Sequence, residues 1–459
     1  MKRALLAAFV LAALVGAVYA FLTLSREQSY RRLIAAGNAA LEADETFEAV
    51  EAFSGAIVLK PDSLLAHVRR GEVYRRQGQL QAAERDLRRA WHLDPTATRP
   101  LVQLADVHFE LRNYARAAER YADYVAIDDG SPRVFYKLAL ARYRAGNPAA
   151  AIEPLQRAVE LNERFSEAHY LLGLCLREAG RTPEALDALE RAVRLAPAFI
   201  VGREELADVF RELARAADEI DQLEALSALD PLPARRVTLG LAQARAGRHR
   251  QAVTTLSQEA DRAPENADVY VALGRIWLET SDGGRDRIAL SKALEALASA
   301  AGRAEEPAEA RALFGRALLQ AGDYEMAERV LQQAVSRLPV DPLALLALAD
   351  AAEQLGHIGE ARQALLKYQV LMGEDANPAR QAQRAARVGE LSIQLQDYPT
   401  AVSWLRRASE ATPGARLLAL LAEAQLGAGD PVGAAATVER GLQMEPRNRA
   451  LLALSRRTR

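Results

Sequence analysis

The 459-residue chain has a single cysteine, Cys175, and therefore lacks every pattern that needs two. One cysteine excludes an internal disulfide and any paired-cysteine metal or redox motif. The sequence also lacks a GxxxxGK[ST] phosphate loop, a GxSxG nucleophile turn and any region typical of β-strands. These absences argue against a nucleotide-binding or hydrolase domain, and they leave the redox compartment open.

Strong charge of either sign is also missing. The net charge is −2 and the isoelectric point is about 6.4, so the chain has no strongly basic surface and we expect no nucleic-acid partner. The six histidines, which are His67, His92, His108, His169, His249 and His357, never pair at i, i+4 or with the cysteine. Zinc sites need such pairs, so we expect no metal and no cofactor.

Residues 4–24 form an uncharged apolar run after Met1, Lys2 and Arg3. As a helix with a rise of 1.5 Å per residue this run would span roughly 30 Å, the thickness of a bilayer core. We therefore predict a signal anchor over 1–24 with a transmembrane helix over 4–24. A cleaved signal peptide and a buried soluble helix are the alternatives. The basic head favours a single-pass inner-membrane protein whose body is periplasmic.

Prolines in the rest of the chain recur at a fixed spacing. Pro61, Pro95, Pro197 and Pro231 are separated by 34, 102 and 34 residues. In this register residues 30–199 divide into five units of 34 residues, and seven more units, with lengths of 33, 34, 41, 34, 40, 33 and 34, follow to residue 448. A repeat of this length indicates a solenoid of stacked units, none of which buries its apolar face alone.

Two positions of the repeat predict its local structure. Position 20 is alanine in ten of the twelve units, where a small residue lets two helices approach closely: Ala49, Ala83, Ala117, Ala151, Ala185, Ala252, Ala327, Ala361, Ala401 and Ala434. Glu219 and Asp286 take this position in units six and eight. Position 15 is glycine in seven units, where a left-handed residue can end a helix: Gly78, Gly146, Gly180, Gly247, Gly322, Gly356 and Gly429. Each unit is therefore predicted to be a helix, a tight turn and a second helix.

The small and large residues at positions 4, 7, 8, 11, 20, 24, 27 and 32 make residues 30–448 resemble the tetratricopeptide repeat family. The resemblance implies an all-α, right-handed superhelical solenoid of about twelve helix-turn-helix repeats. The predicted parts are a connector at 25–29, units one to eight from 30 to 279, an extended second helix of unit eight at 280–307, units nine to twelve at 308–448, and a capping helix at 449–459. The insertions at 280–306 and 372–383 are either hinges or tolerated loops.

In the family that the chain resembles, positions 2, 5, 9 and 12 of the first helices face a concave groove. In units three to five these positions hold aromatic and arginine side chains, which are enriched at interaction hot spots. The candidate groove residues are Arg99, Phe109, Arg133, Tyr136, Tyr143, Tyr170 and Arg177. Either they bind a peptide or a helix of a partner, or the aromatic rings pack neighbouring helices. The same positions in units nine to twelve are mostly aliphatic or small, as at Ala312 and Leu346.

These observations predict a binding protein and not an enzyme. The leading hypothesis is a scaffold, anchored in the membrane through residues 4–24, that holds together the subunits of a bacterial envelope complex. Such complexes serve, by family resemblance, polysaccharide export, pilus or secretion-system assembly, or envelope biogenesis. One alternative is a cytoplasm-facing regulator tethered to a membrane enzyme. Another is an enzyme with a cryptic site, which would require an acidic pair or a histidine cluster to converge from distant units.

Overall fold

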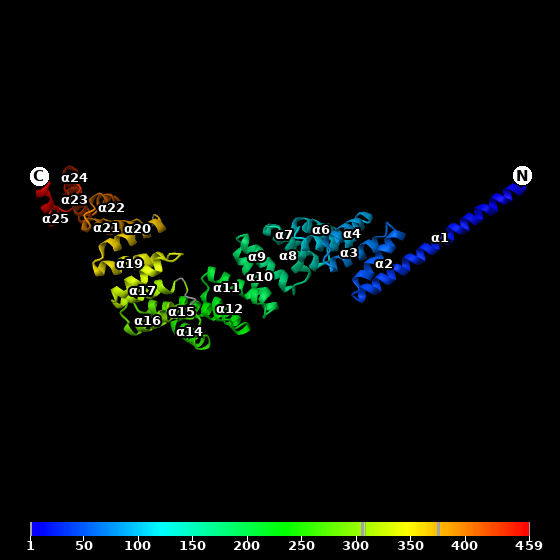
Figure 1. Ribbon diagram of the computed structural model, residues 1–459, viewed down its shortest axis with the longest axis horizontal. Coiled ribbons are helices and arrows are strands. Elements are labelled where there is room, and N and C mark those ends of the chain that lie inside the picture. Colours follow the sequence, from blue (N-terminus) through cyan, green and yellow to red (C-terminus); the bar gives the residue numbers. More distant parts are fainter. Residues whose placement is uncertain (1, 304–306, 308, 374–376, 459) are drawn as a thin grey trace. The chain divides into compact units, whose positions relative to one another are not determined.

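The computed structural model describes residues 2–303, 307, 309–373 and 377–458, without the side chains of residues 2–8, 10 and 12. The described residues form 25 helices and no strand. They divide into two compact units, Met1–Ala214 and Arg215–Arg459, which are treated separately below. The predicted all-helical repeat fold is confirmed, with helices α2–α24, which are of similar length, following one another in antiparallel pairs (Figure 1).

The first unit is a row of helices in which each packs against the next. Its helices are α1 (Lys2–Glu42), α2 (Thr46–Leu59), α3 (Leu64–Arg76), α4 (Leu80–Leu93), α5 (Thr98–Glu110), α6 (Tyr114–Ile127), α7 (Pro132–Arg144), α8 (Pro148–Leu161), α9 (Ser166–Glu178), α10 (Thr182–Leu195) and α11 (Ile200–Glu212).

The second unit continues the same alternation of helices and short turns. Its helices are α12 (Ala216–Leu229), α13 (Pro233–Arg245), α14 (His249–Arg262), α15 (Ala267–Thr280), α16 (Arg287–Ala301), α17 (Ala310–Ala321), α18 (Tyr324–Val335), α19 (Pro342–Leu355), α20 (Ile358–Met372), α21 (Pro378–Gln394), α22 (Tyr398–Ala411), α23 (Ala415–Gly427), α24 (Pro431–Met444) and α25 (Arg449–Arg457).

Helix α1 begins at Lys2 and passes through residues 25–29 without a break. In the part of the chain that the structure describes, no helix has both the length and the apolar character needed to cross a membrane. This finding corrects the prediction of a transmembrane helix over 4–24, and with it the single-pass inner-membrane location. The finding concerns the described residues, and the side chains of residues 4–8, 10 and 12 of the predicted span lie outside them.

The two positions that predicted the hairpin have the expected environments. All ten alanines at position 20 are completely buried. All seven glycines at position 15 have a positive φ, between 71° and 83°. The turn keeps this left-handed conformation where glycine is missing, at Asp44, Arg112, Ala214 and Gln396. The hairpin geometry is therefore common to repeats with and without the turn glycine.

A glycine at position 8 marks the point where the two helices of a repeat come closest. A Cβ atom placed on any of seven such glycines would lie within 2.9 Å of a leucine or phenylalanine side chain on the second helix. The seven pairs are Gly37–Phe53, Gly71–Leu87, Gly173–Leu189, Gly240–Leu256, Gly274–Leu297, Gly315–Leu331 and Gly389–Leu405. Absence of a side chain on one helix thus makes room for a large residue on the other.

The eighth repeat places its extra residues differently from the simple alignment. Residues 281–286 form the turn between α15 and α16, and the Asp286 side chain accepts hydrogen bonds from the first amides of α16. Ala293, completely buried, takes the place at the helix contact that the alignment gave to Asp286. Residues 304–306 of this insertion, and 374–376 of the insertion at 372–383, lie outside the described residues.

Two of the buried carboxylates of the repeats illustrate pairing with arginine. The Asp86 carboxylate of α4 receives two hydrogen bonds of 2.7 Å from the Arg70 guanidinium of α3 and lies 3.2 Å from His67 Nδ1. Arg70 also donates to Ser54 of the preceding repeat at 3.1 Å, so the network joins repeats one and two. In repeat six, the buried Glu219 at position 20 lies 2.7 Å from Arg245.

Candidate functional site

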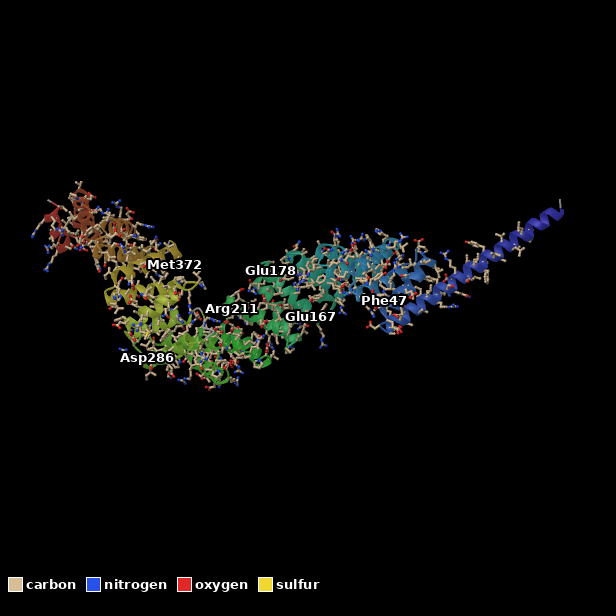
Figure 2. The ribbon with its side chains drawn as sticks, viewed as in Figure 1. Phe47, Glu167, Glu178, Arg211, Asp286 and Met372 are labelled. Atoms are coloured by element: carbon tan, nitrogen blue, oxygen red, sulfur yellow. The ribbon has the colours of Figure 1, made fainter. Side chains whose placement is uncertain are left out.

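A cavity of about 650 Å³ lies on the side of the first unit formed by α5, α7 and α9. It extends from the end of α3 to the start of α9, where Glu167 is labelled in Figure 2. Its lining residues are Arg75, Asp106, Phe109, Glu110, Tyr121, Pro132, Arg133, Tyr136, Lys137, Leu140, Asn162, Phe165 and Glu167. We call this cavity the α7 groove.

One wall of the α7 groove is apolar. Phe109, Tyr136, Leu140 and Phe165 are each only partly buried, so their side chains keep surface facing the cavity. The rings of Tyr136 and Phe165 lie 5.0 Å apart at an angle of 47°. The contact lies within repeat four, where Tyr136 belongs to α7 and Phe165, the last residue of the repeat, immediately precedes α9. The aromatic residues therefore both pack neighbouring helices and line the cavity.

The floor of the α7 groove is a network of ion pairs and hydrogen bonds centred on Asp106. Its carboxylate accepts hydrogen bonds from Lys137 at 2.7 Å, Arg75 at 3.3 Å and the Tyr121 hydroxyl at 2.5 Å. Arg75 also donates to Glu110 at 2.8 Å. Burial, followed by the charge of Asp106, raises the pKa of Tyr121. The tyrosine therefore stays a neutral hydrogen-bond donor, and the floor has a fixed polar arrangement.

A second hollow, of about 500 Å³, lies between α9 and its neighbours and is lined by Tyr143, Tyr170, Leu174, Arg177, Glu178 and Glu205. The Tyr143 hydroxyl donates to Glu178 at 2.9 Å. Burial, together with this carboxylate, raises the pKa of Tyr143 to about 12. Arg177 pairs with both Glu205 and Glu212. The ring of Tyr170 meets Phe199 edge to face at 4.9 Å.

The predicted groove residues fall into three groups. Phe109, Arg133 and Tyr136 line the α7 groove, and Tyr143, Tyr170 and Arg177 line the second hollow. Arg99 lines neither; it is exposed and pairs with Glu72 at 3.2 Å. A binding role for the seven residues stays a prediction.

Sequence reasoning missed the residues that form the floor of the α7 groove. Lys137 stands at position 6 of its repeat, and Tyr121 stands at position 24, which is otherwise occupied mainly by leucine. The tyrosine at a leucine position was the one available signal, since a hydroxyl buried there needs a polar partner. That partner is Asp106.

The second unit has its own cavity at the corresponding helices. A hollow of about 700 Å³ is lined by residues of α15 and α17 and by the start of α19, including Arg275, Glu309, Arg316 and Asp341. Arg275 and Glu309 form an ion pair. In the sequence the groove positions of the later repeats are mostly aliphatic or small, and so the charged side chains of this cavity were not predicted.

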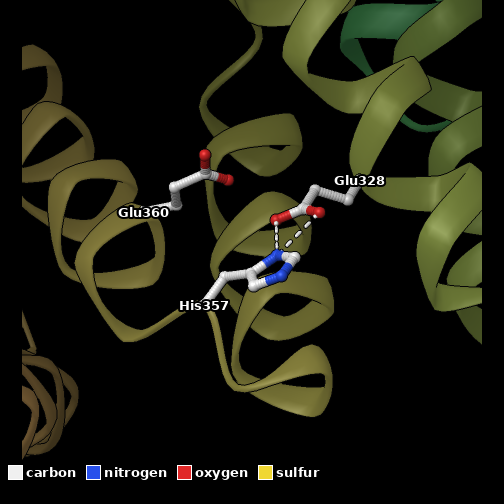
Figure 3. Close-up of side chains that lie close together, drawn as sticks. All are labelled: Glu328, His357 and Glu360. Atoms are coloured by element: carbon white, nitrogen blue, oxygen red, sulfur yellow. Dashed lines mark hydrogen bonds and ion pairs between the residues drawn. The ribbon is translucent and has the colours of Figure 1, made fainter.

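Three potential metal ligands converge elsewhere in the second unit. Glu328 of α18, His357 and Glu360 each offer one ligand atom, and these atoms all lie within 4.8 Å of one another (Figure 3). His357 and Glu360 lie at the start of α20, in the repeat after that of Glu328. The search for paired histidines missed this group because its ligands come from two repeats.

The thiol of Cys175 is buried and is expected to react slowly. Cys175 is completely buried on α9, and burial raises its pKa to about 12. Because the thiolate is the reactive form, alkylation by iodoacetamide at pH 8 is expected to be more than about 100-fold slower than that of a free thiol. Mass spectrometry of timed samples measures this rate. Complete labelling in guanidinium chloride is the control, and labelling of the folded chain at the free-thiol rate would contradict the prediction.

Comparison with known proteins gives a consistent picture of the fold. A model of the tetratricopeptide repeat matches residues 34–98, 136–198, 237–301 and 313–385, together more than half of the chain. Two further models of this repeat match residues 74–141 and 415–440. No match was found among curated proteins.

Several solved structures are similar. A MamA protein is 23% identical over 37% of this chain and 92% of that chain, with a TM-score of 0.36. YrrB, described as a TPR protein with an unusual peptide-binding site, is 22% identical over 40% and 94%, with a TM-score of 0.37. Yeast Tom70 is 13% identical over 81% and 97%, with a TM-score of 0.38. At these values the likenesses carry no functional argument.

Proposed function

Because the chain belongs to the tetratricopeptide repeat family, we propose that its first unit binds a segment of a partner protein in the α7 groove. The family's repeat fold suits the chain to protein–protein interaction or scaffolding, and it is typically not enzymatic. The observation that carries the proposal is the α7 groove itself, a cavity of about 650 Å³ with an aromatic wall above a floor of ion pairs.

The two surfaces of the groove suit different parts of a bound segment. The partly buried rings of Phe109 and Tyr136 offer apolar area for a hydrophobic side chain of the partner. Arg133 is exposed at the edge of the cavity and can donate to a carboxylate or a main-chain carbonyl. The charged side chains of the floor are already paired with one another. A bound segment that excludes water from the groove therefore does not strip an unpaired charge of its hydration.

The narrower role in a bacterial envelope complex depended on the predicted membrane span over residues 4–24. The described residues do not support that span, and the proposal is therefore limited to the binding of a partner protein.

Photocrosslinking tests the proposal. A photoreactive amino acid at Tyr136 or Phe109, both of which line the α7 groove, is introduced in the full chain in its host cells and is expected to capture the same partner segment from both positions. Mass spectrometry identifies the captured peptide. The matched control is the same amino acid at Glu119, an exposed residue on the second helix of repeat three.

Affinity measurements with the captured peptide complete the test. Tyr136→Ala is expected to weaken binding about 30-fold, the effect of losing an interaction of about 2 kcal/mol at a hot spot. Glu119→Ala should leave the affinity unchanged. Crosslinks from Tyr136 and Phe109 only to neighbouring repeats of the same chain would exclude the α7 groove as a binding site.

A further inference from the structure

The cluster of Glu328, His357 and Glu360 has the composition of a metal site. His357 Nδ1 lies 3.0 Å from each carboxylate oxygen of Glu328. Figure 3 shows the carboxylate of Glu360 directed toward the same space from the neighbouring turn of α20. One imidazole nitrogen and two carboxylates are ligands that zinc and other divalent transition metals accept.

The burial of Glu328 sets this cluster apart from the other buried acids. The four buried carboxylates in the described residues are Asp86, Glu219, Glu259 and Glu328. The first three lie against the arginines Arg70, Arg245 and Arg236. Glu328, only 7% exposed, has instead a histidine and a second carboxylate beside it. A cation bound by all three side chains would supply the positive charge that arginine supplies elsewhere.

The second carboxylate is held close to the first. The ligand atoms of Glu328 and Glu360 lie within 4.8 Å of each other, and two carboxylates at this distance repel one another. Gln332, one turn after Glu328 on α18, donates to Glu360 at 2.9 Å and fixes its orientation. A bound cation would remove the repulsion, and Gln332 would act as the outer partner of a ligand.

Neither His357 nor Glu360 is used to cap the helix that it begins. His357 is the N-cap residue of α20, yet its side chain makes no capping hydrogen bond. Its main-chain amide donates to Ala352 at 2.8 Å, so Glu360 has no capping role at that amide. A hollow of about 200 Å³, lined by Gln332 and Glu360 but not by Glu328 or His357, lies beside the cluster.

We propose that Glu328, His357 and Glu360 bind a divalent transition metal ion of the zinc class, with water as the remaining ligand. The ion links α18 to the start of α20 and thereby joins the ninth repeat to the tenth. Imidazole among the ligands favours zinc over magnesium or calcium, which prefer oxygen. The inference concerns the second unit and is independent of the function proposed for the α7 groove.

Zinc titration of the full-length, tag-free chain, freed of metal with EDTA, tests the proposal. Calorimetry is expected to show one bound equivalent of ZnSO₄. Glu328→Gln, His357→Gln and Glu360→Gln should each weaken this binding at least about tenfold. The matched control is Glu325→Gln, an exposed glutamate three residues earlier on α18, which should bind as the natural chain does.

A spectroscopic measurement on the unchanged chain tests metal binding without relying on the folding of the ligand variants. Cobalt added to the unchanged chain is expected to give visible absorption bands that one equivalent of zinc removes, and Glu360→Gln, at an exposed position, should lack these bands. Absence of zinc binding by the natural chain would overturn the proposal. Equal binding by the three ligand variants and Glu325→Gln would also overturn it.

Discussion

The Asp86→Ala variant is expected to lose about 3–5 kcal/mol of stability in repeats one and two, because it leaves a partly buried arginine without its buried carboxylate partner. Asp86 is 6% exposed and holds Arg70 through two hydrogen bonds of 2.7 Å. Without the carboxylate, Arg70 keeps only its bond to Ser54 among the contacts described above. The loss should therefore spread to the repeat before the substituted one.

Hydrogen exchange of the full chain measures this loss, since the repeats of a solenoid need not unfold together. Amides of α2, α3 and α4 should exchange faster in the variant, while those of α9 and α10 should be unaffected. Asp123→Ala is the control: Asp123 pairs with Arg120 at 2.6 Å but is about half exposed. Such surface pairs contribute less than about 1 kcal/mol. Equal effects of the two substitutions would contradict the prediction.

The same ion pair predicts a pH dependence. Burial alone would raise the pKa of Asp86, but hydrogen bonds from Arg70 and His67 outweigh burial and hold the pKa below its ordinary value of 3.8. A carboxyl with a lowered pKa contributes fully above its unfolded value and loses its contribution as the pH falls through the folded value. The stability difference between the natural chain and Asp86→Ala should thus be constant from pH 7 to about 5 and shrink below 3.8.

The second large effect is expected at the contact between the two helices of repeat five. In Gly173→Val the new Cβ would lie 2.6 Å from Leu189 and 3.2 Å from the main-chain oxygen of Ala185. The leucine can move only into a completely buried environment, and the main chain is fixed by α10. We expect a loss of about 3 kcal/mol, at the upper end of the range for overpacked cores.

A double-mutant cycle distinguishes this clash from a general effect of substitution. Leu189→Ala alone should cost about 2–5 kcal/mol through the cavity that it leaves. The double variant Gly173→Val/Leu189→Ala should cost less than the sum, because the valine fills part of that cavity. Gly359→Ala, which meets nothing within 4 Å, is the control and should not destabilise α20. Additive costs in the cycle would show that the close approach of the two helices is not the cause.

The sequence predicted the features that repeat. Alanine at position 20 allows the close approach of two helices, and glycine at position 15 allows the left-handed turn between them. Each recurs in most of the twelve units, so both requirements can be recognised from the sequence. An insertion shifts the numbering of the positions within a repeat. In repeat eight Ala293 makes the helix contact, although position 20, counted from the start of the unit, is Asp286. The residue that corresponds to the position-20 alanine of the other repeats is therefore identified by its contact in the structure and not by its place in the count.

The candidate sites were less predictable because they depend on departures from the pattern. Tyr121 stands at a position that is mainly leucine in the other repeats, and only the structure brings it and Lys137 to Asp106. Glu328 and His357 are 29 residues apart and belong to different repeats. No spacing rule within one helix could have joined them. The transmembrane helix over 4–24 was predicted from the length and apolar composition of that segment, and no helix of the described residues is long and apolar enough to cross a membrane.

The left-handed backbone at Asp44, Arg112, Ala214 and Gln396 has a consequence for tracing repeats through diverged relatives. Residues with side chains adopt this conformation at a cost of about 1–2 kcal/mol each, which the surrounding contacts must offset. Evolution can thus erase the turn glycine while the hairpin persists. A count of repeats based on that glycine alone will be too low, whereas the small residues between the paired helices provide a more durable marker.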